Sequence, residues 1–202
     1  MKKNIIIIGT GRVGKTTLAK KLNEELNYSV IGTDDLITAF ERSLPQLGIG
    51  SSYDIGAAIA NFTPFLAHLI GGMAYRSSCH NGSHYVFEGS GSHFDLEKML
   101  PILHMYDEWK DNYLLIGMIY PEIAPNDLFN DIRKHDVESD WTYNLSDDEL
   151  KNHVIDGIEY SRNFHEKFQK YNPIVYDVSK NREKVLDEIV RDIKEGINDN
   201  NS

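Results

Sequence analysis

A glycine-rich stretch near the amino terminus contains the residue types that bind phosphate. It reads Gly9-Thr10-Gly11-Arg12-Val13-Gly14-Lys15-Thr16-Thr17, and its first eight residues fit the pattern G-x-x-x-x-G-K-[S/T]. In such a loop the glycines let successive backbone N–H groups point inward, and the following helix adds the positive end of its dipole. Lys15 would reach the β- and γ-phosphates of a nucleotide, and the Thr16 hydroxyl would ligate Mg²⁺.

The residues on either side predict a strand before this loop and a helix after it. Residues 4–8 are a short β-branched run, which indicates a strand buried on both faces. Leu18, Leu22 and Leu26 recur every four residues among polar ones, which indicates an amphipathic helix. The alternative is a glycine-rich turn with a surface lysine, and the strand, loop and helix order favours nucleotide binding over it.

The rest of the chain alternates apolar runs with helical patterns, which predicts a parallel sheet wrapped by helices. The other predicted strands are 28–31, 84–87, 113–120 and 173–176. The other predicted helices are 34–42, 55–76, 96–107, 127–134 and 182–197. Ser146 and Glu149 fit a capping box that starts a further helix, which we expect to run to about residue 171. No second domain is indicated.

Together these motifs resemble the small P-loop kinases, a family that includes adenylate-kinase-like and shikimate-kinase-like enzymes. The resemblance rests on the loop at 9–16, "IGTDDL" at 31–36, "VFEGS" at 86–90, an arginine-bearing segment before a long helix, and "YDVSKNREKVLDEIV" at 176–190. It implies a single α/β domain over 1–202, a three-layer P-loop NTPase fold with a central five-stranded parallel sheet flanked by helices. It also implies a lid segment at about 121–146.

The "GTDDL" motif follows the second predicted strand, where related kinases place an acidic residue near Mg²⁺ or the acceptor hydroxyl. A carboxylate there can take the hydroxyl proton or hold a metal-bound water. We expect Asp34 rather than Asp35 to do so, with catalytic and metal-site roles. The alternative is that one aspartate caps the helix that begins there. Several metabolite kinases carry an arginine where this chain has Ile37. The identity of the phosphate acceptor therefore cannot be inferred from the family.

Glu88 ends the third predicted strand, where the family often has an acidic residue that orients Mg²⁺ through water. Because open α/β sheets bind ligands at the carboxyl ends of their strands, Glu88 would lie in the binding crevice. The alternative is a strand-end carboxylate that only satisfies backbone donors. Ser90 and Ser92, just beyond it, are candidates for substrate contact.

Cations must close over the transferred phosphoryl group, and in related kinases arginines on a mobile lid do so. The resemblance implies catalytic roles for Arg133 within 121–146 and Arg162 on the next helix, together with Lys15. For each of these arginines a solvated helix face is the alternative.

The loop after the last predicted strand lies beside the adenine in the family. The resemblance therefore implies nucleotide contacts from Ser179 and Arg182. Alternatively, Ser179 or Asn181 caps the last helix.

The histidines and the lone cysteine give no sign of a zinc site, because no pair has the required close spacing. His80, His84 and His93 are near loops and are candidates for substrate approach. Several aromatic residues are expected in the core or in the pocket lining: Tyr53, Phe62, Phe65 and Tyr75.

Composition excludes several classes of protein. The 202 residues carry a formal net charge of −10, which disfavours nucleic-acid binding. Cys79 is the single cysteine, and no charged and then apolar leader opens the chain, so we expect a cytoplasmic protein. The longest apolar stretch, 55–75, is interrupted by Asn61, Pro64 and His68, and we expect a buried helix rather than a membrane span.

The resemblance implies an ATP-dependent kinase that transfers the γ-phosphate to a small-molecule acceptor, with ATP and Mg²⁺ as cofactors. A GTP-hydrolysing switch is disfavoured because the guanine-reading Asn-Lys-x-Asp is absent. An ATPase or a nucleotide-binding regulator without a small-molecule acceptor stays open. Acceptor identity and oligomeric state are not determined by the sequence.

Overall fold

The computed structural model describes residues 3–50, 54–79, 83–106, 113–138 and 140–196. Within them, five parallel strands form one sheet in the order β2-β3-β1-β4-β5. The strands are β1 (Asn4–Gly9), β2 (Tyr28–Gly32), β3 (His84–Ser90), β4 (Tyr113–Ile119) and β5 (Ile174–Asp177). The predicted five-stranded parallel sheet is therefore confirmed.

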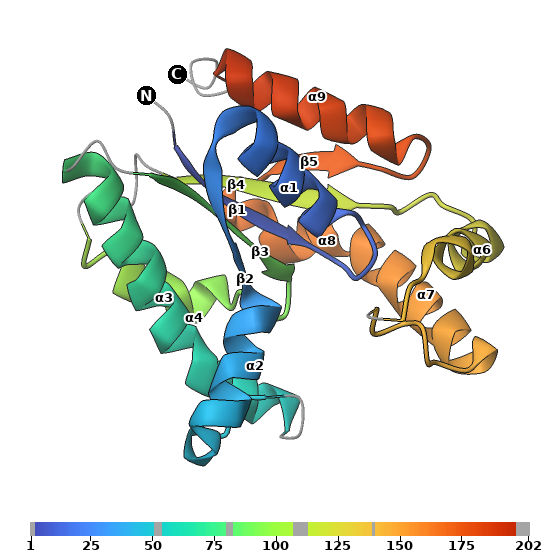
Figure 1. Cartoon of the computed structure of the whole chain (residues 1–202), viewed down its shortest axis with the longest axis horizontal. Helices are drawn as coiled ribbons and strands as arrows, with labels where there is room; N and C mark the ends of the chain where they lie inside the picture. The colour runs from blue at the N-terminus through green and yellow to red at the C-terminus, as the bar shows by residue number, and fades with distance from the viewer. Residues whose placement is uncertain (1–2, 51–53, 80–82, 107–112, 139, 197–202) are drawn as a thin grey trace.

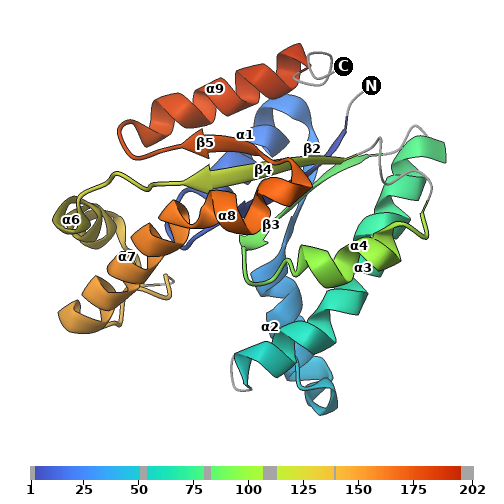
Figure 2. The same ribbon diagram turned by 180° about the vertical axis from the view of Figure 1, so that it is seen from behind.

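Helices cover both faces of the sheet, with α1 and α9 on one side and α3, α4 and α8 on the other (Figures 1 and 2). The helices in chain order are α1 (Lys15–Leu26), α2 (Thr33–Ser43), η1 (Pro45–Leu47), α3 (Ile55–Cys79), α4 (Leu96–Leu103), α6 (Pro125–His135), α7 (Asp147–Arg162), α8 (Phe164–Phe168), η2 (Gln169–Tyr171) and α9 (Arg182–Glu195). The η elements are short 3₁₀ helices. This is the predicted three-layer arrangement.

The isoleucines of β1 divide the core into two clusters. Ile5 and Ile7 pack with helix residues such as Leu18 on one face, whereas Ile6 and Ile8 belong to a second cluster on the other. Because successive side chains of a strand point to opposite faces, a central parallel strand needs apolar residues at every position. The continuous run at 5–8 meets that need.

The helix expected from 147 to about 171 is instead broken at Asn163. Its predicted capping box at Ser146 is present. Buried residues of α7 such as Val154 pack in the first cluster, whereas Phe164 and Phe168 of α8 stack with ring centroids 4.6 Å apart in the second. The buried residues before and after Asn163 thus belong to different core clusters, and the helix is interrupted between them.

Two other helices end earlier than predicted. Helix α4 stops at Leu103 rather than 107, and the next residues form a turn in which the Met105 N–H bonds to the Ile102 carbonyl. Helix α9 stops at Glu195 because Gly196 takes a left-handed conformation with φ 78°.

Helix α3 is long and apolar enough over Gly56–Ser77 to cross a membrane by length and composition alone, with mean hydropathy 1.3. Its residues Phe62, Leu66 and Ile70 pack in the core beneath the sheet, and core helices pass the same test. The apolar character of α3 is thus explained by the core. Of the aromatic residues expected there, Phe62 is buried, Phe65 and Tyr75 are exposed, and Tyr53 lies outside the described residues.

Candidate active site

The phosphate loop leaves the carboxyl end of β1 and leads directly into α1. Strand β1 lies between β3 and β4, at the centre of the sheet, where ligands of open α/β sheets bind. A Cβ at Gly9 would come within 2.5 Å of the Met118 carbonyl oxygen. Gly14 precedes α1 with φ 99°, a conformation that favours glycine. Both glycines of the motif are therefore required by the local backbone.

Lys15 is buried in the loop, where its Nζ donates a hydrogen bond to the Thr10 carbonyl oxygen at 2.7 Å. Burial lowers the pKa of Lys15 to about 8, although the nearby carboxylates of Glu88 and Asp34 raise it. The lysine is thus held over the loop, with its ammonium group withdrawn from water.

Glu88 and Thr16 meet at the carboxyl edge of the sheet. Glu88 pairs in register with Ile7 of β1 and with Gly32 of β2, and its Oε1 accepts a hydrogen bond from the Thr16 hydroxyl at 3.2 Å. Burial raises the pKa of Glu88, whereas Lys15 and the Thr16 hydrogen bond lower it. The shared contact places the predicted Mg²⁺ residues side by side.

This donor set fits Mg²⁺ better than a transition metal. Mg²⁺ keeps several waters and takes one or two carboxylate or hydroxyl ligands beside substrate phosphates. In the described parts of the chain no three His, Cys, Asp or Glu side chains gather closely enough to hold a metal by themselves. Thr16 and Glu88, with Asp34 nearby, would therefore hold Mg²⁺ together with water and phosphate.

Asp34 lies in the first turn of α2, opposite the loop. The residue before that helix is Gly32, and no side chain caps it, so neither aspartate acts as the cap. The Asp34 side chain is 81% exposed, with its Oδ1 3.6 Å from Nδ1 of His93. His93 is also 2.7 Å from the Thr33 hydroxyl, and burial lowers its pKa. His93, one of three histidines proposed from the sequence, therefore lies beside Asp34.

One pocket of about 1190 Å³ joins these groups. Its lining includes Gly11, Arg12, Gly14, Lys15, Thr16, Thr17, Asp34, Glu88, Ser90, Ser92 and His93. Of the remaining predicted nucleotide contacts, Val13 is buried in the core and Thr10 lines an adjoining pocket of about 300 Å³. His84 starts β3 at the opposite end of the sheet and contacts Tyr28, and His80 lies outside the described residues. His84 lines neither pocket.

The 121–146 segment lies against the phosphate loop through acidic residues. Arg12 pairs with Asp136 at 2.9 Å and with Asp140 at 3.0 Å. Trp141 covers Gly11, whose Cβ position is 3.1 Å from the indole Cζ2. No specific sequence signal predicted these contacts, although the tryptophan and the aspartates fall within the predicted lid.

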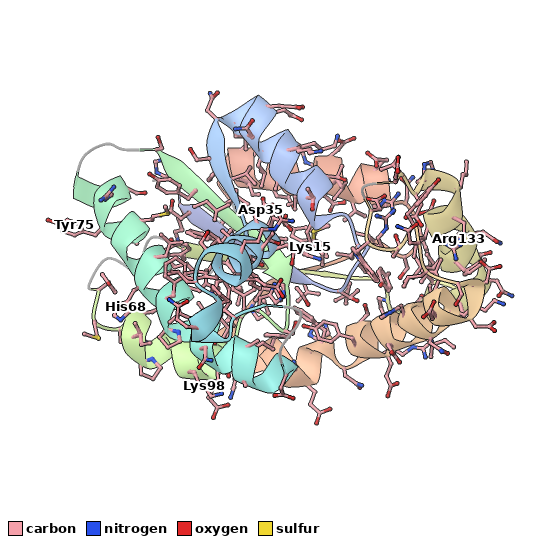
Figure 3. The ribbon with its side chains drawn as sticks, turned by 60° about the horizontal axis from the view of Figure 1, so that its bottom comes forward. Lys15, Asp35, His68, Tyr75, Lys98 and Arg133 are labelled. Atoms are coloured by element: carbon pink, nitrogen blue, oxygen red, sulfur yellow. The ribbon has the colours of Figure 1, made fainter. Side chains whose placement is uncertain are left out.

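The two arginines expected over the phosphates are directed elsewhere. Arg133 donates to the Leu145 carbonyl oxygen at 2.7 Å and pairs with Asp147 at 2.9 Å. Figure 3 shows Arg133 far from Lys15, near the outer edge of the molecule. Arg162 donates to the Pro121 carbonyl oxygen at 3.1 Å, and neither arginine lines the pocket. Their catalytic role stays a prediction, which requires both side chains to leave these partners.

Some residues at the start of α9 and in the loop before it make structural hydrogen bonds, and one lines the pocket. Asn181 caps α9 by accepting from the Lys184 N–H, and the Ser179 hydroxyl accepts from the Glu122 N–H at 3.1 Å. Arg182 lines the pocket beside Gly14 and pairs with Asp131 of α6 at 3.1 Å. Of the two predicted nucleotide contacts in this loop, only Arg182 faces the pocket.

Solved structures share this architecture along almost the whole chain. Shikimate kinase from Bacteroides thetaiotaomicron aligns over 96% of this chain and 97% of its own, with 17% identity and a TM-score of 0.51. Shikimate kinase from Acinetobacter baumannii, solved in complex with shikimate, aligns over 96% and 93% with 12% identity and a TM-score of 0.54. The chain has the fold of the small P-loop kinases.

The P-loop kinase fold extends to a gluconokinase from Sinorhizobium meliloti, which aligns over 96% of this chain and 93% of its own, with 12% identity and a TM-score of 0.51. No protein-family model and no curated protein sequence matches the chain. At this level of identity the likeness shows the fold alone, and the chemistry depends on the residues of the site.

Proposed function

We propose that the protein is an ATP-dependent kinase that transfers the γ-phosphate to the hydroxyl of a small molecule, with Mg²⁺. The observation that carries this proposal is the hydrogen bond between Thr16 and Glu88 beside the buried Lys15, in a pocket that also contains Asp34. The solved structures of shikimate kinases and a gluconokinase with the same fold support it. A metabolite kinase of this kind would act in the cytoplasm.

Each of these side chains has a role that suits phosphoryl transfer. Lys15 and the loop N–H groups would neutralise and orient the phosphates, since this chemistry depends on positioning and charge stabilisation. Bound Mg²⁺ would neutralise charge on the β- and γ-phosphates. Asp34, open to the pocket, would orient the acceptor hydroxyl and take its proton. Its neighbour His93 would fix the Asp34 carboxylate.

The test is transfer of label from γ-labelled ATP to compounds of a metabolite extract in the presence of Mg²⁺. We expect label on a small organic molecule with the natural protein and none with Lys15→Ala. Asp34→Asn should lose transfer by about 10²- to 10⁴-fold, the range for a general base, while nucleotide binding is kept. Asp127→Asn is the matched control, because Asp127 lies exposed in the first turn of α6 and does not line the pocket.

Other outcomes would favour a different function. Label released only as inorganic phosphate would indicate an ATPase, and label left on ATP would indicate a nucleotide-binding regulator. Either result would contradict the proposed kinase.

A further inference from the structure

The positive charges of the large pocket are confined to its nucleotide side. Among the described residues that line it, the lysines and arginines are Arg12, Lys15, Lys20 and Arg182. They come from the phosphate loop, from α1 and from the start of α9. These cations surround the place where a nucleotide's phosphates would lie.

The other side of the pocket is built by α2 and α3, and we call it the acceptor compartment. Its lining is Asp34, Ile37, Thr38 and Glu41 of α2, Ile49, Gly50, and Ala58, Ile59 and Phe62 of α3, with His93 opposite. The four α2 residues stand at i, i+3, i+4 and i+7, so they share one face of the helix. No lysine or arginine of the described chain joins this part of the lining.

The charged groups of the acceptor compartment are carboxylates. Asp34 is 81% exposed to the pocket region, and Glu41 packs against Gly50, where a Cβ would lie 2.6 Å from Glu41 Cδ. The His93 imidazole is already engaged within the lining, since its Nδ1 lies 2.7 Å from the Thr33 hydroxyl and 3.6 Å from Asp34 Oδ1. An acid group bound here would meet like charges and no guanidinium to pair with it.

Much of the remaining lining is apolar. Ile37 and Ile59 are partly exposed in this lining, whereas Ile49 and Phe62 are buried. Phe62 makes a T-shaped contact with Phe40 and a tilted one with Phe65, with ring centroids 6.2 Å and 6.1 Å apart. Ile37 lies on the same face of α2 as Asp34. Such a surface is suited to the apolar part of a ligand, with a few polar groups to orient it.

The adjoining pocket of about 300 Å³ also lacks a cation for an acid group on its α7 wall. That wall presents His153, Asp156 and Tyr160, and Arg12, the arginine in this lining, is already paired with Asp136 and Asp140. Arg162 of the same helix faces away, toward Pro121. An acceptor that extends toward α7 therefore meets no free arginine in the described residues there.

From this charge distribution we infer that the phosphate acceptor is a hydroxyl compound without an acid group, neutral or positively charged, and with an apolar portion. The inference rests on the proposed kinase function. It separates the chain from the shikimate and gluconate kinases whose fold it shares, since the acceptors in those names are acids.

The experiment divides a metabolite extract by ion exchange at pH 7 into anionic, neutral and cationic pools, each freed of nucleotides. Each pool is incubated with γ-labelled ATP, Mg²⁺ and the full-length protein, beside Lys15→Ala. We expect labelled product from the neutral or cationic pool, from a compound that reversed-phase chromatography retains. Transfer in the anionic pool alone overturns the inference and leaves the kinase function intact. Transfer in no pool contradicts the kinase function, and the inference falls with it.

Two variants test the inferred charge of the acceptor, with the compound that the pool experiment identifies as substrate. Glu41→Gln keeps the side chain's shape and removes its charge. Its KM for a cationic acceptor should rise about threefold to fivefold, as expected for one partly exposed ion pair, and its KM for a neutral acceptor should stay within about twofold. Ile37→Arg adds a cation on the same face of α2 and should allow transfer to compounds of the anionic pool. A lower KM for Glu41→Gln would indicate an anionic acceptor and contradict the inference.

Discussion

At the scale of single residues, Lys15 is held where burial opposes its charge. Burial lowers its pKa to about 8 in the free protein, and bound phosphates would raise that pKa. Below pH 8 the lysine is already charged, so nucleotide affinity should be nearly constant. Above pH 8 binding must take up a proton, so affinity should fall by up to about tenfold per pH unit.

Titration of a fluorescent ATP analogue between pH 6.5 and pH 9.5 measures this dependence. Lys15→Arg is the control, because a guanidinium stays charged throughout this range and should give a flatter profile. A natural protein whose affinity is constant up to pH 9.5 would show that Lys15 does not titrate there.

Glu88 is a second ionisable side chain whose charged form is disfavoured by burial. Its pKa is raised by burial, so ionising it costs free energy that Lys15 and Thr16 offset in part. Glu88→Gln should therefore keep or raise the melting temperature while abolishing the gain in nucleotide affinity that Mg²⁺ provides. Nucleotide titrations with and without Mg²⁺ check this, with the exposed Glu25→Gln as control. An undiminished Mg²⁺ effect in Glu88→Gln would remove Glu88 from the metal site.

At the scale of elements, the 121–146 segment is joined to the phosphate loop by two carboxylates of unequal burial. Asp136 is 3% exposed and also accepts from the Thr142 hydroxyl at 2.5 Å, whereas Asp140 is 28% exposed. Losing a buried, hydrogen-bonded charge partner costs more than losing a partly exposed one. Asp136→Asn should destabilise the fold by about 1–3 kcal/mol and Asp140→Asn by less than about 1 kcal/mol.

Chemical denaturation and hydrogen exchange measure both effects. Exchange should be faster over 136–146 in Asp136→Asn, because Thr142 and Arg12 lose a shared partner. Asp148→Asn, with a side chain that is 95% exposed, is the control and should change little. Equal losses in the free energy of unfolding for Asp136→Asn and Asp140→Asn would show that burial does not set the strength of these ion pairs with Arg12.

At the scale of the whole molecule, α8 is fitted closely against the sheet at a glycine. A Cβ on Gly117 of β4 would lie 2.5 Å from two ring atoms of the buried Phe164. Gly117→Ala should therefore displace α8 and cost about 1–3 kcal/mol, as overpacking of a core does. Gly72→Ala is the matched control, because nothing lies within 4 Å of its Cβ position and alanine favours a helix. Denaturant unfolding measures the free energy of unfolding of both variants. Equal values for Gly117→Ala and Gly72→Ala would contradict the close fit.

The sequence by itself determined the elements and the phosphate loop. The period of the apolar residues and the glycines at 9 and 14 are local signals, since they depend on strand and helix geometry and on backbone conformation. For the same reason the five strands, the loop and the Ser146 capping box were predicted close to where the structure has them. Glu88 could be expected near the loop because parallel strands end at one edge.

Only the tertiary structure decided which side chains meet across the chain. Arg133 can reach any of several carboxylates or carbonyls, and its partner was settled by the packing of α6 on α7. The pairing of Arg12 with Asp136, the place of His93 beside Asp34 and the break at Asn163 likewise depend on segments far apart in sequence. Long charged side chains carry no periodic signal of their partners, so the charge distribution that restricts the acceptor emerged only from the folded chain.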